Sequence, residues 1–525
     1  MRVSVFTAAL VATPVLAYPG MRNTLAEIQA RENKSNSGKS TELLGDLASL
    51  DDSKLTSVGK NIKQLLTGSG NAQSDAAYQN DQKSSIPVHP RDYSYEGSGG
   101  AGGVPSDGGK SYSGAPPPSG GGGATAPGGG YPSAPPGSGG PPSSKGDKPS
   151  SPGGTPPAPG GGSYGGAPPA PGGGSSCPPK DTPACAADTC CIWKYIADDL
   201  ATTFRGESGR CTDFARAAIR LGFHDAAGWS KGTGNLGGAD GSIILAPSEM
   251  QRVENKGLEE IVEQTKAWFN KYQQYGIGMA DLIQFSANVA TVVCPLGPRV
   301  RTFVGRKDSS VPAPPNLLPD VNSPADALIE LFGNKTISSY GLISLIGAHT
   351  TSQQRFVDSA RAGDPQDSTP GVWDVKFYSE TIGNAPARVF KFNSDIALSK
   401  YPSTSAQFKA FAGPGGQSAW NDGYAREYVR LSLLGVYNIN DLTECTKALP
   451  ARWAPSGFTA SDQGNVDTWL STKGPVPKIP DEIRKGKSIG KPPPPAGPQG
   501  PNGNSSPPSQ GSKGGSGGGS GGYGN

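Results

Sequence analysis

Residues 211–228 read CTDFARAAIRLGFHDAAG, and this stretch governs the interpretation of the folded part of the chain. Arg220 precedes His224 by four residues, so on a helix the two side chains project from one face, one turn apart. A cation beside an imidazole lowers the pKa of the imidazole, which suits a neutral general base. The apolar neighbours Ile219 and Leu221 place the pair near a core rather than on a helix surface. The stretch therefore predicts a helix that carries a base for proton transfer.

An oxygen-rich loop follows each histidine of this region. GGADGS at 237–242 comes after His224, and DSTPGVWD at 367–374 comes after His349, which ends the apolar stretch GLISLIGAHT. Carboxylate, hydroxyl and backbone carbonyl oxygens are the ligands that Ca²⁺ prefers. The candidate ligands are Asp225, Gly238, Asp240 and Ser242 near the first histidine and Asp367, Thr369, Val372 and Asp374 near the second. The sequence thus predicts two Ca²⁺ sites, one beside each histidine.

Composition limits the classes of protein that fit. The 525 residues include 77 Gly and 51 Pro, about a quarter of the chain, so it cannot be one compact domain throughout. The formal net charge is only +3, which argues against nucleic-acid partners and against a polybasic membrane-binding patch. One apolar run stands out, at the N-terminus, so we expect no transmembrane helix.

Residues 1–17 are typical of a secretory signal peptide. Arg2 is followed by an apolar stretch from Val3 and by small residues that end at Ala17. We therefore expect a secreted, extracellular protein, in which disulfides are the usual state of cysteine. The chain has seven cysteines, so one of them is left over. The glycine-rich C-terminus has no hydrophobic tail, which argues against a lipid anchor.

Four regions follow the signal peptide. Residues 18–93 are polar with two short amphipathic stretches, and we interpret them as a pro-region, a docking element or a small folded module. His89 lies at their end, with the pattern of an exposed loop histidine. Residues 94–176 form a Gly/Pro/Ser-rich linker, residues 177–475 hold every Cys and Trp, and residues 476–525 form a disordered Pro/Gly-rich tail. The Gly/Pro-rich segments are candidates for association with a cell wall or polysaccharide.

Helical periodicity dominates residues 177–475. The stretches 257–272, 279–293, 338–349 and 421–436 read as helices, and no stretch alternates convincingly with a period of two. The predicted fold class is mainly α.

The combined motifs resemble the secreted fungal haem peroxidases of the plant-type superfamily, which include lignin, manganese and versatile peroxidases. The resemblance rests on FHD with its upstream arginine, GGADGS, GAHT and DSTPGVWD, and runs in the family's order through roughly residues 177–450. It implies a two-lobed helical domain with one haem b and two Ca²⁺. It also implies reduction of H₂O₂ and oxidation of phenols or other small aromatic reductants in successive one-electron steps.

The resemblance implies a role for each motif residue. His349 is the expected proximal iron ligand, and Arg220 and His224 are expected on the distal side, where they drive O–O heterolysis. The expected supporting residues are Asn255 as acceptor of the His224 Nδ1–H, Glu249 as the acid that holds Asn255, Asp395 as partner of His349, and Phe223 as a cofactor contact. Thr350 joins the proximal Ca²⁺ ligands. The implied disulfides are Cys177–Cys191, Cys190–Cys445 and Cys211–Cys294, which leave Cys185 without a family partner.

The residues through which specialised members of the family accept electrons from their substrates are missing from this sequence. Manganese peroxidases use three carboxylates at positions that correspond to Asp213, Ala217 and Arg355 here, a poor Mn²⁺ site. Lignin and versatile peroxidases use a tryptophan where this chain has Ser344. We therefore expect a generic low-potential peroxidase that oxidises aromatics at the haem edge. Trp373 is interpreted as a packing residue, with a radical site as the alternative.

Two other functions compete with the peroxidase. One is a wall-associated structural protein with a catalytically idle peroxidase fold, but such a scaffold has no need of the complete set of expected active-site residues. The other is a metal hydrolase, which would usually need a third histidine or a carboxylate ligand cluster beside the two histidines.

Overall fold

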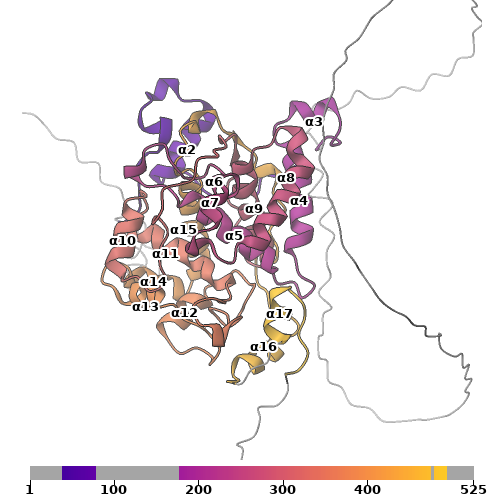
Figure 1. Cartoon of the computed structure of the whole chain (residues 1–525), viewed down its shortest axis with the longest axis vertical. Coiled ribbons are helices and arrows are strands. Elements are labelled where there is room, and N and C mark those ends of the chain that lie inside the picture. The colour runs from indigo at the N-terminus through magenta and orange to yellow at the C-terminus, as the bar shows by residue number, and fades with distance from the viewer. Residues whose placement is uncertain (1–37, 79–176, 474–477, 493–525) are drawn as a thin grey trace, which may run out of the picture. The chain divides into compact units, whose positions relative to one another are not determined.

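The computed structural model describes residues 38–78, 177–473 and 478–492 (Figure 1). The predicted signal peptide, the linker at 94–176, His89 and the last part of the tail lie outside the described residues.

Helices make up nearly all of the regular structure, so the predicted mainly α fold class is confirmed. The α-helices are α2 (Ser57–Thr67), α3 (Pro183–Ala187), α4 (Cys191–Phe204), α5 (Asp213–Ala226), α6 (Ser242–Leu245), α7 (Pro247–Met250), α8 (Glu259–Tyr272), α9 (Met279–Val293), α10 (Ala325–Gly333), α11 (Ser339–Ile346), α12 (Lys376–Ile382), α13 (Asn393–Lys400), α14 (Ser405–Ala412), α15 (Gly416–Leu431), α16 (Gln463–Leu470) and α17 (Lys478–Arg484).

Short elements connect these helices. The 3₁₀ helices are η1 (Gly45–Ala48), η2 (Asp52–Lys54), η3 (Lys231–Thr233), η4 (Val253–Asn255), η5 (Gln273–Tyr275), η6 (Gly347–Thr351), η7 (Ser359–Arg361), η8 (Ile439–Asp441) and η9 (Thr446–Ala448). The strands β1 (Phe303–Val304) and β2 (Thr443–Glu444) pair antiparallel. The four helices predicted by periodicity appear as α8, α9, α11 and α15.

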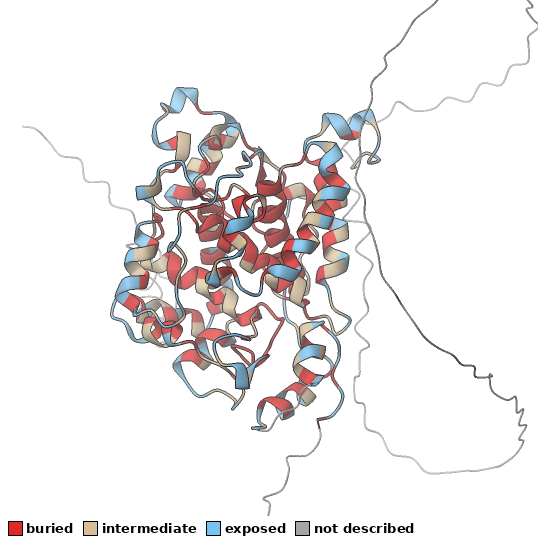
Figure 2. Cartoon of the chain, in the orientation of Figure 1, coloured by how far each residue is buried: buried red, intermediate tan, exposed pale blue. Residues whose placement is uncertain are grey.

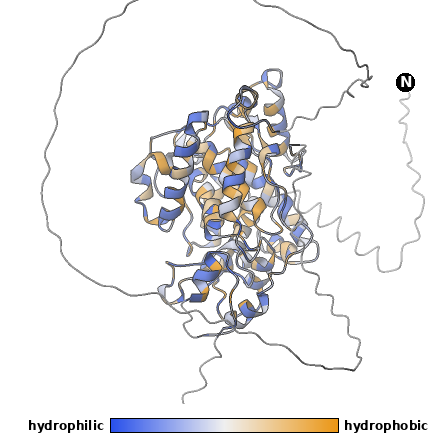
Figure 3. Cartoon of the chain, turned by 90° about the vertical axis from the view of Figure 1, so that its right-hand side faces the viewer, coloured by the Kyte–Doolittle hydropathy of each residue, from blue (hydrophilic) through white to orange (hydrophobic). Residues whose placement is uncertain are grey.

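Helix α9 is the centre of the fold. Its sequence, MADLIQFSANVATVV, is mostly apolar or small, and all of its residues, including the polar Asp281, Gln284 and Asn288, are buried (Figure 2). A helix that is hydrophobic all round needs neighbours on all sides. Helices α4, α5 and α8 pack against it and are themselves amphipathic. Hydrophilic and hydrophobic residues both occur along the helices of the folded part (Figure 3).

Helix α5 approaches α9 closely because it carries a glycine at the contact. A Cβ at Gly222 would lie 2.8 Å from Ala287 Cβ and 2.4 Å from the Tyr428 hydroxyl, so no side chain fits there. The Gly222 carbonyl accepts a hydrogen bond from Gln284 Nε2 at 3.0 Å. These contacts fix the position of α5 along α9 and its rotation about its own axis.

A second group of helices, α10 to α15, packs around α11 and α15. Ser338 caps α11, and the helix continues as η6, which carries His349. A Cβ at Gly347 would lie 2.3 Å from both Trp420 Nε1 and the Tyr378 hydroxyl. Two large aromatic side chains therefore reach the backbone that leads into His349.

The N-terminal segment 38–78 is part of this folded unit. Its leucine and isoleucine side chains belong to the same hydrophobic cluster as α9. Arg430, on α15, is buried and donates hydrogen bonds to the carbonyls of Ser40, Glu42 and Leu66 at 3.0, 2.8 and 3.0 Å. Of the interpretations of region 18–93, the described part thus agrees with a segment docked on the domain.

Residues 478–492 continue the fold beyond the predicted boundary at 475. Helices α16 and α17 share a small apolar core that includes Trp469 and Ile483. The buried Arg210 donates two hydrogen bonds to Asp462, which precedes α16, at 3.1 and 2.6 Å. The prediction of a disordered tail from 476 is therefore wrong for 478–492. Isoleucine side chains of this segment complete the small apolar core.

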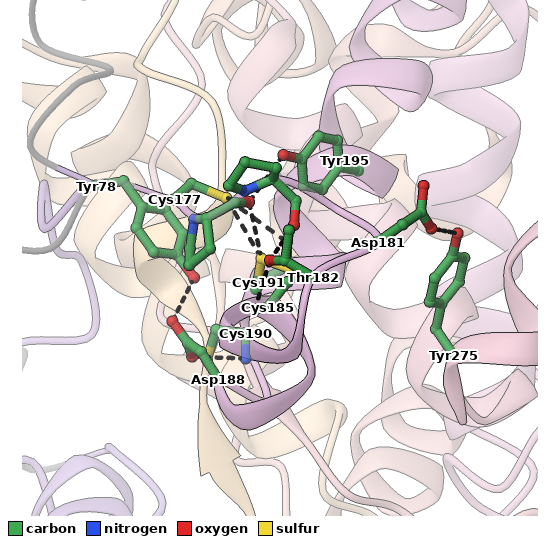
Figure 4. The surroundings of a disulfide bond; sticks show 12 residues. Tyr78, Cys177, Asp181, Thr182, Cys185, Asp188, Cys190, Cys191, Tyr195 and Tyr275 are labelled. Atoms are coloured by element: carbon green, nitrogen blue, oxygen red, sulfur yellow. Dashed lines mark hydrogen bonds between the residues drawn. A yellow bond between two sulfur atoms is a disulfide. The ribbon is translucent and has the colours of Figure 1, made fainter. Parts of the chain in front are cut away.

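The disulfides Cys190–Cys445 and Cys211–Cys294 are present as the resemblance implies, but the predicted Cys177–Cys191 bond is wrong. Cys191 is bonded to Cys185, and Cys177 Sγ lies 3.6 Å from Cys191 Sγ (Figure 4). The physical reason is α3, which brings Cys185 within 5.3 Å (Cα to Cα) of Cys191, at the start of α4. Two cysteines thus compete for one partner.

Among the described residues, no single helix is long and apolar enough to cross a membrane. Residues 259–275 (α8 and η5) and 279–293 (α9) would together be long and apolar enough for a span, but the two segments are bent by 118° at the break between them.

The anchoring of segment 38–78 can be tested with Arg430→Met, which leaves three buried carbonyls without their donor. We expect a loss of about 3 kcal/mol in the free energy of unfolding, measured by denaturant titration, and faster protease cleavage within 38–78. Arg426→Met is the matched control, because Arg426 makes only a 3.5 Å contact to the Leu65 carbonyl. Equal effects of the two variants would contradict the anchoring role of Arg430.

The competition between cysteines predicts different outcomes for two serine variants. In Cys185→Ser, we expect Cys177 to bond to Cys191, because their sulfur atoms are already 3.6 Å apart. In Cys191→Ser, neither bond is available, and we expect a larger loss of thermal stability. Peptide mapping of non-reduced digests identifies the bonded pair. Recovery of alkylated Cys191 from Cys185→Ser would overturn this prediction.

Candidate active site

The predicted helix in 211–228 is α5, and it presents Arg220 and His224 on one face. Thr212 caps the helix by accepting a hydrogen bond from the Ala215 amide. Arg220 Nε–H donates to His224 Nε2 at 3.2 Å, and its two terminal nitrogens donate to the carbonyls of Glu254 and Lys256, both at 3.0 Å. The guanidinium is therefore held beside the imidazole by three hydrogen bonds.

Asn255 in η4 determines the tautomer of His224. Its Nδ2–H₂ donates to the Glu249 carbonyl at 2.8 Å, so its Oδ1 faces His224 Nδ1, also at 2.8 Å. An amide oxygen only accepts hydrogen bonds, so Nδ1 of the imidazole carries the hydrogen. His224 Nε2 is then the nitrogen with the lone pair, in agreement with its acceptance of the Arg220 hydrogen bond.

Burial and charge keep His224 neutral. The imidazole is buried, and this burial, together with the nearby Arg220, lowers its pKa to about 3. The hydrogen bond to Asn255 opposes this effect only partly. Burial also lowers the pKa of Arg220 to about 10, so the guanidinium stays charged at neutral pH. The pair is thus a neutral base beside a cation.

Glu249 contacts Asn255, as the resemblance implies, but through its backbone and not through its carboxylate. The contact to Asn255 comes from the Glu249 backbone carbonyl, while the carboxylate Oε2 accepts from the Ala313 amide at 2.8 Å. The short helix α7 turns the Glu249 side chain toward the segment at Ala313 and leaves its carbonyl facing Asn255. Phe223 packs against the His224 ring, with centroids 5.7 Å apart, and stacks on Phe332.

His349 occupies the other histidine position, on η6. Its Nδ1 lies 3.0 Å from Asp395 Oδ2, and the Asp395 carboxylate is buried at the start of α13. The edges of Phe377 and Phe392 meet its ring at right angles. Its side chain nevertheless keeps 33% of its surface accessible. With Nδ1 committed to Asp395, Nε2 is the nitrogen available as a ligand.

Arg216 is a candidate site residue that the sequence analysis missed. It lies one turn before Arg220 on α5, and its guanidinium donates to Gln353 Oε1 at 2.6 Å and to the Arg484 carbonyl at 3.2 Å. Arg216 is only 8% exposed, yet its Nε has no hydrogen-bond partner among the described residues. A buried guanidinium with an unused donor suits an anion such as a haem carboxylate. The spacing of four residues from Arg216 through Arg220 to His224 was the available signal.

The predicted distal Ca²⁺ ligands meet where α5 ends and α6 begins. Asp225 Oδ2 accepts from the Gly241 amide, while Asp225 Oδ1 and Ser242 Oγ are buried without any hydrogen-bond partner among the described residues. Burial and the neighbouring Asp240 raise the pKa of Asp225 well above its usual value. A buried carboxylate with an unused oxygen, beside the half-buried Asp240, fits a divalent cation.

The proximal candidates form a similar cluster. Thr350 Oγ1 donates to Asp367 and lies 3.2 Å from the Val372 carbonyl, and Thr369 Oγ1 donates to Asp374 at 2.8 Å. Burial and Asp374 raise the pKa of Asp367 well above normal. Within the described ranges, no group of three or more His, Cys, Asp or Glu side chains converges on one point. Each cluster has two carboxylates and otherwise hydroxyl and carbonyl oxygens, a donor set that suits Ca²⁺ rather than a transition metal.

The residues at the positions that specialised peroxidases use for Mn²⁺ binding or electron transfer make other contacts here. Asp213 Oδ2 accepts from Arg484 Nη1 at 2.7 Å, and Arg355 lies 3.5 Å from Asp481, so both residues contact the C-terminal segment. Ser344 Oγ donates to the Tyr340 carbonyl. Trp373 is fully buried and stacks on Trp420 with ring centroids 4.8 Å apart, as its interpretation as a packing residue predicts.

Comparisons with known proteins agree with this geometry. A family model described as Peroxidase matches residues 197–414. The chain is 30% identical over 302 residues to a peroxidase of Arthromyces ramosus, covering 52% of this chain and 81% of that protein. It is 30% identical over 297 residues to a low-redox potential peroxidase of Taiwanofungus camphoratus, covering 52% and 84%. It is 28% identical over 332 residues to versatile peroxidase VPS1 of Pleurotus eryngii, covering 56% and 88%.

The matched relatives are covered over more than two thirds of their length, at up to 30% identity. Members of this family generally use haem and calcium, and they are oxidoreductases that use H₂O₂. The chain therefore belongs to the fungal haem peroxidases of the plant-type superfamily, and it is an H₂O₂-dependent enzyme.

Proposed function

We propose that this enzyme oxidises phenolic and similar small aromatic reductants, with His224 and Arg220 driving O–O heterolysis and His349 as the haem ligand. The single observation that carries the proposal is that the Nδ1 atom of each histidine is hydrogen-bonded to a side-chain oxygen, that of His224 to Asn255 and that of His349 to Asp395. Each imidazole thereby has its lone pair on Nε2, which in His224 also accepts the hydrogen bond from Arg220. Haem b, when bound, supplies the redox-active iron at which H₂O₂ is reduced.

The distal side chains supply the proton transfer. Neutral His224 would accept a proton at Nε2 from one oxygen of H₂O₂ and return it to the other oxygen, which would leave as water, while bound haem would supply the two electrons that break the O–O bond. Arg220 stabilises the negative charge that develops on the leaving oxygen. Asn255 keeps the hydrogen on Nδ1, so Nε2 stays basic.

The proximal side chains tune the ligand. Asp395 accepts the Nδ1–H of His349, which makes the imidazole a more electron-rich ligand and holds its orientation. Phe377 and Phe392 pack on the ring and limit its rotation. Arg216 is proposed to bind a haem carboxylate through its unused Nε.

We propose Ca²⁺ at both oxygen clusters, with Asp225, Gly238, Asp240 and Ser242 on the distal side. The proximal ligands are Thr350, Asp367, Thr369, Val372 and Asp374. The unsatisfied oxygens of Asp225 and Ser242 support the distal assignment. Because Asp225 directly follows His224, and Thr350 directly follows His349, each ion would hold the backbone beside one imidazole.

The proposal extends to the place of action. The three disulfides are typical of proteins from oxidising compartments. We propose secretion directed by residues 1–17, with 94–176 as a linker and both Gly/Pro-rich segments as candidates for wall or polysaccharide association. An idle structural role is disfavoured, because a scaffold has no use for a tautomer-fixed base beside a half-buried cation.

The test of the proposed base is His224→Leu in haem-loaded protein. We expect the second-order rate constant with H₂O₂ to fall by about 10²- to 10⁴-fold, measured by stopped-flow absorption of the Soret band. Asn255→Ala is the comparison for a positioning residue, with an expected loss of about 10- to 100-fold. Retention of the wild-type rate in His224→Leu, with normal haem content, would remove His224 as the base.

Calcium removal tests the two clusters. We expect two Ca²⁺ per chain by elemental analysis and a lower Tm after chelation. A site held at a hundredfold excess over its Kd stabilises the fold by about 2.7 kcal/mol. Asp225→Asn and Asp367→Asn should each lower the stoichiometry by one. If the chain bound no calcium and its Tm did not change when the chelator was added, both proposed sites would be refuted.

A further inference from the structure

Phe356 lies at the junction between the two histidine-bearing parts of the site. It follows His349 by seven residues, and its ring reaches the segment just after Asn255. A Cβ placed on Gly257 would lie 2.5 Å from Phe356 Cε2 and 3.4 Å from Arg220 Nη1. The ring therefore closes against the distal backbone while its own chain comes from the proximal side.

Gly257 makes this approach available. Its φ of +88° is a left-handed conformation, and the absence of a side chain lets the aromatic ring lie on the backbone. The same segment is fixed to the active site, because Arg220 binds the carbonyls of Glu254 and Lys256. Phe356 is thus held beside the distal arginine by a backbone that cannot shift without moving Arg220.

The ring remains open to solvent in spite of these contacts. Phe356 is 54% exposed, and the adjacent Val357 is 45% exposed. Exposed apolar side chains that lie together beside an active site often mark a ligand surface. An aromatic face next to a peroxidase site suits an aromatic reductant.

A cation accompanies the ring. Lys256 Nζ lies 4.7 Å from the Phe356 ring centroid, at cation–π distance. Within the described residues, Lys256 forms no ion pair with a carboxylate, although Glu254 and Glu259 are close in sequence. Its ammonium is exposed and available to an anionic group.

We propose that Phe356 and Lys256 form a binding site for aromatic reductants that carry a carboxylate, such as phenolic acids. The substrate ring packs on Phe356, and its carboxylate pairs with Lys256 Nζ. This inference rests on the proposed function and names its substrate class. Overall, one H₂O₂ takes one electron and one proton from each of two phenol molecules, which gives two waters and two phenoxyl radicals.

The test compares 4-hydroxycinnamate with its methyl ester, using haem-loaded full-length protein. In Lys256→Gln, we expect the ratio of KM for the acid to KM for the ester to rise by about 3- to 5-fold, the scale of an exposed ion pair. In Phe356→Ala, both KM values should rise by about 5- to 10-fold, because the aromatic contact serves both compounds. Phe356→Leu is the fallback if the alanine variant does not fold.

Matched controls and a binding measurement separate this site from general effects. Lys266→Gln and Ile382→Ala remove a surface lysine and an exposed apolar side chain elsewhere, and neither should alter the ratio. Equilibrium dialysis without H₂O₂ should show weaker binding of the acid to Lys256→Gln, and added salt should reduce wild-type binding.

Failure of the substrate site and failure of the proposed function give different results. If the wild-type protein does not react with H₂O₂ in stopped flow, the proposed function fails. If it reacts, but Lys256→Gln keeps the wild-type ratio and Phe356→Ala keeps both KM values, the substrate site is overturned while the enzyme remains.

Discussion

The packing of α5 on the wholly buried α9 is the constraint on which the rest of the site depends. Gly222 removes the side chain that would separate these helices, and the Gln284 hydrogen bond fixes their contact. Arg216, Arg220 and His224 then share the face of α5 opposite to this contact, at intervals of four residues. In the proposed function these three residues bind an anion, stabilise charge and act as the base, and their alignment would then be a consequence of core packing rather than of a flexible loop.

Local patterns were sufficient for much of the fold. The apolar run in α9 and the amphipathic stretches predicted helices at their observed places, because helix formation reports on neighbouring residues. The pairing of Arg220 with His224 followed from the same periodicity. The contacts of Asn255 and Asp395 followed only from family resemblance, since no local rule connects Asp395 with a histidine 46 residues away.

The features that the sequence did not predict are contacts over long separations. Arg430 meets the Ser40 carbonyl across 390 positions, and Arg484 meets Asp213 across 271. Neither leaves a periodic signal, because the donor and the acceptor are both ordinary polar groups in their own surroundings. The Cys185–Cys191 bond spans only six positions and was missed for a different reason: the position of three nearby sulfur atoms depends on how α3 turns into α4.

The anchoring of segment 38–78 has a consequence for proteolytic maturation. The guanidinium of Arg430 is hydrogen-bonded to carbonyls of that segment, and the segment's leucine and isoleucine side chains belong to the main core, so its departure would break these bonds and expose apolar surface to water. A cut between residues 79 and 176 would accordingly yield two polypeptides that stay associated as one enzyme. Trimming that stops short of residue 38 would leave the catalytic unit whole.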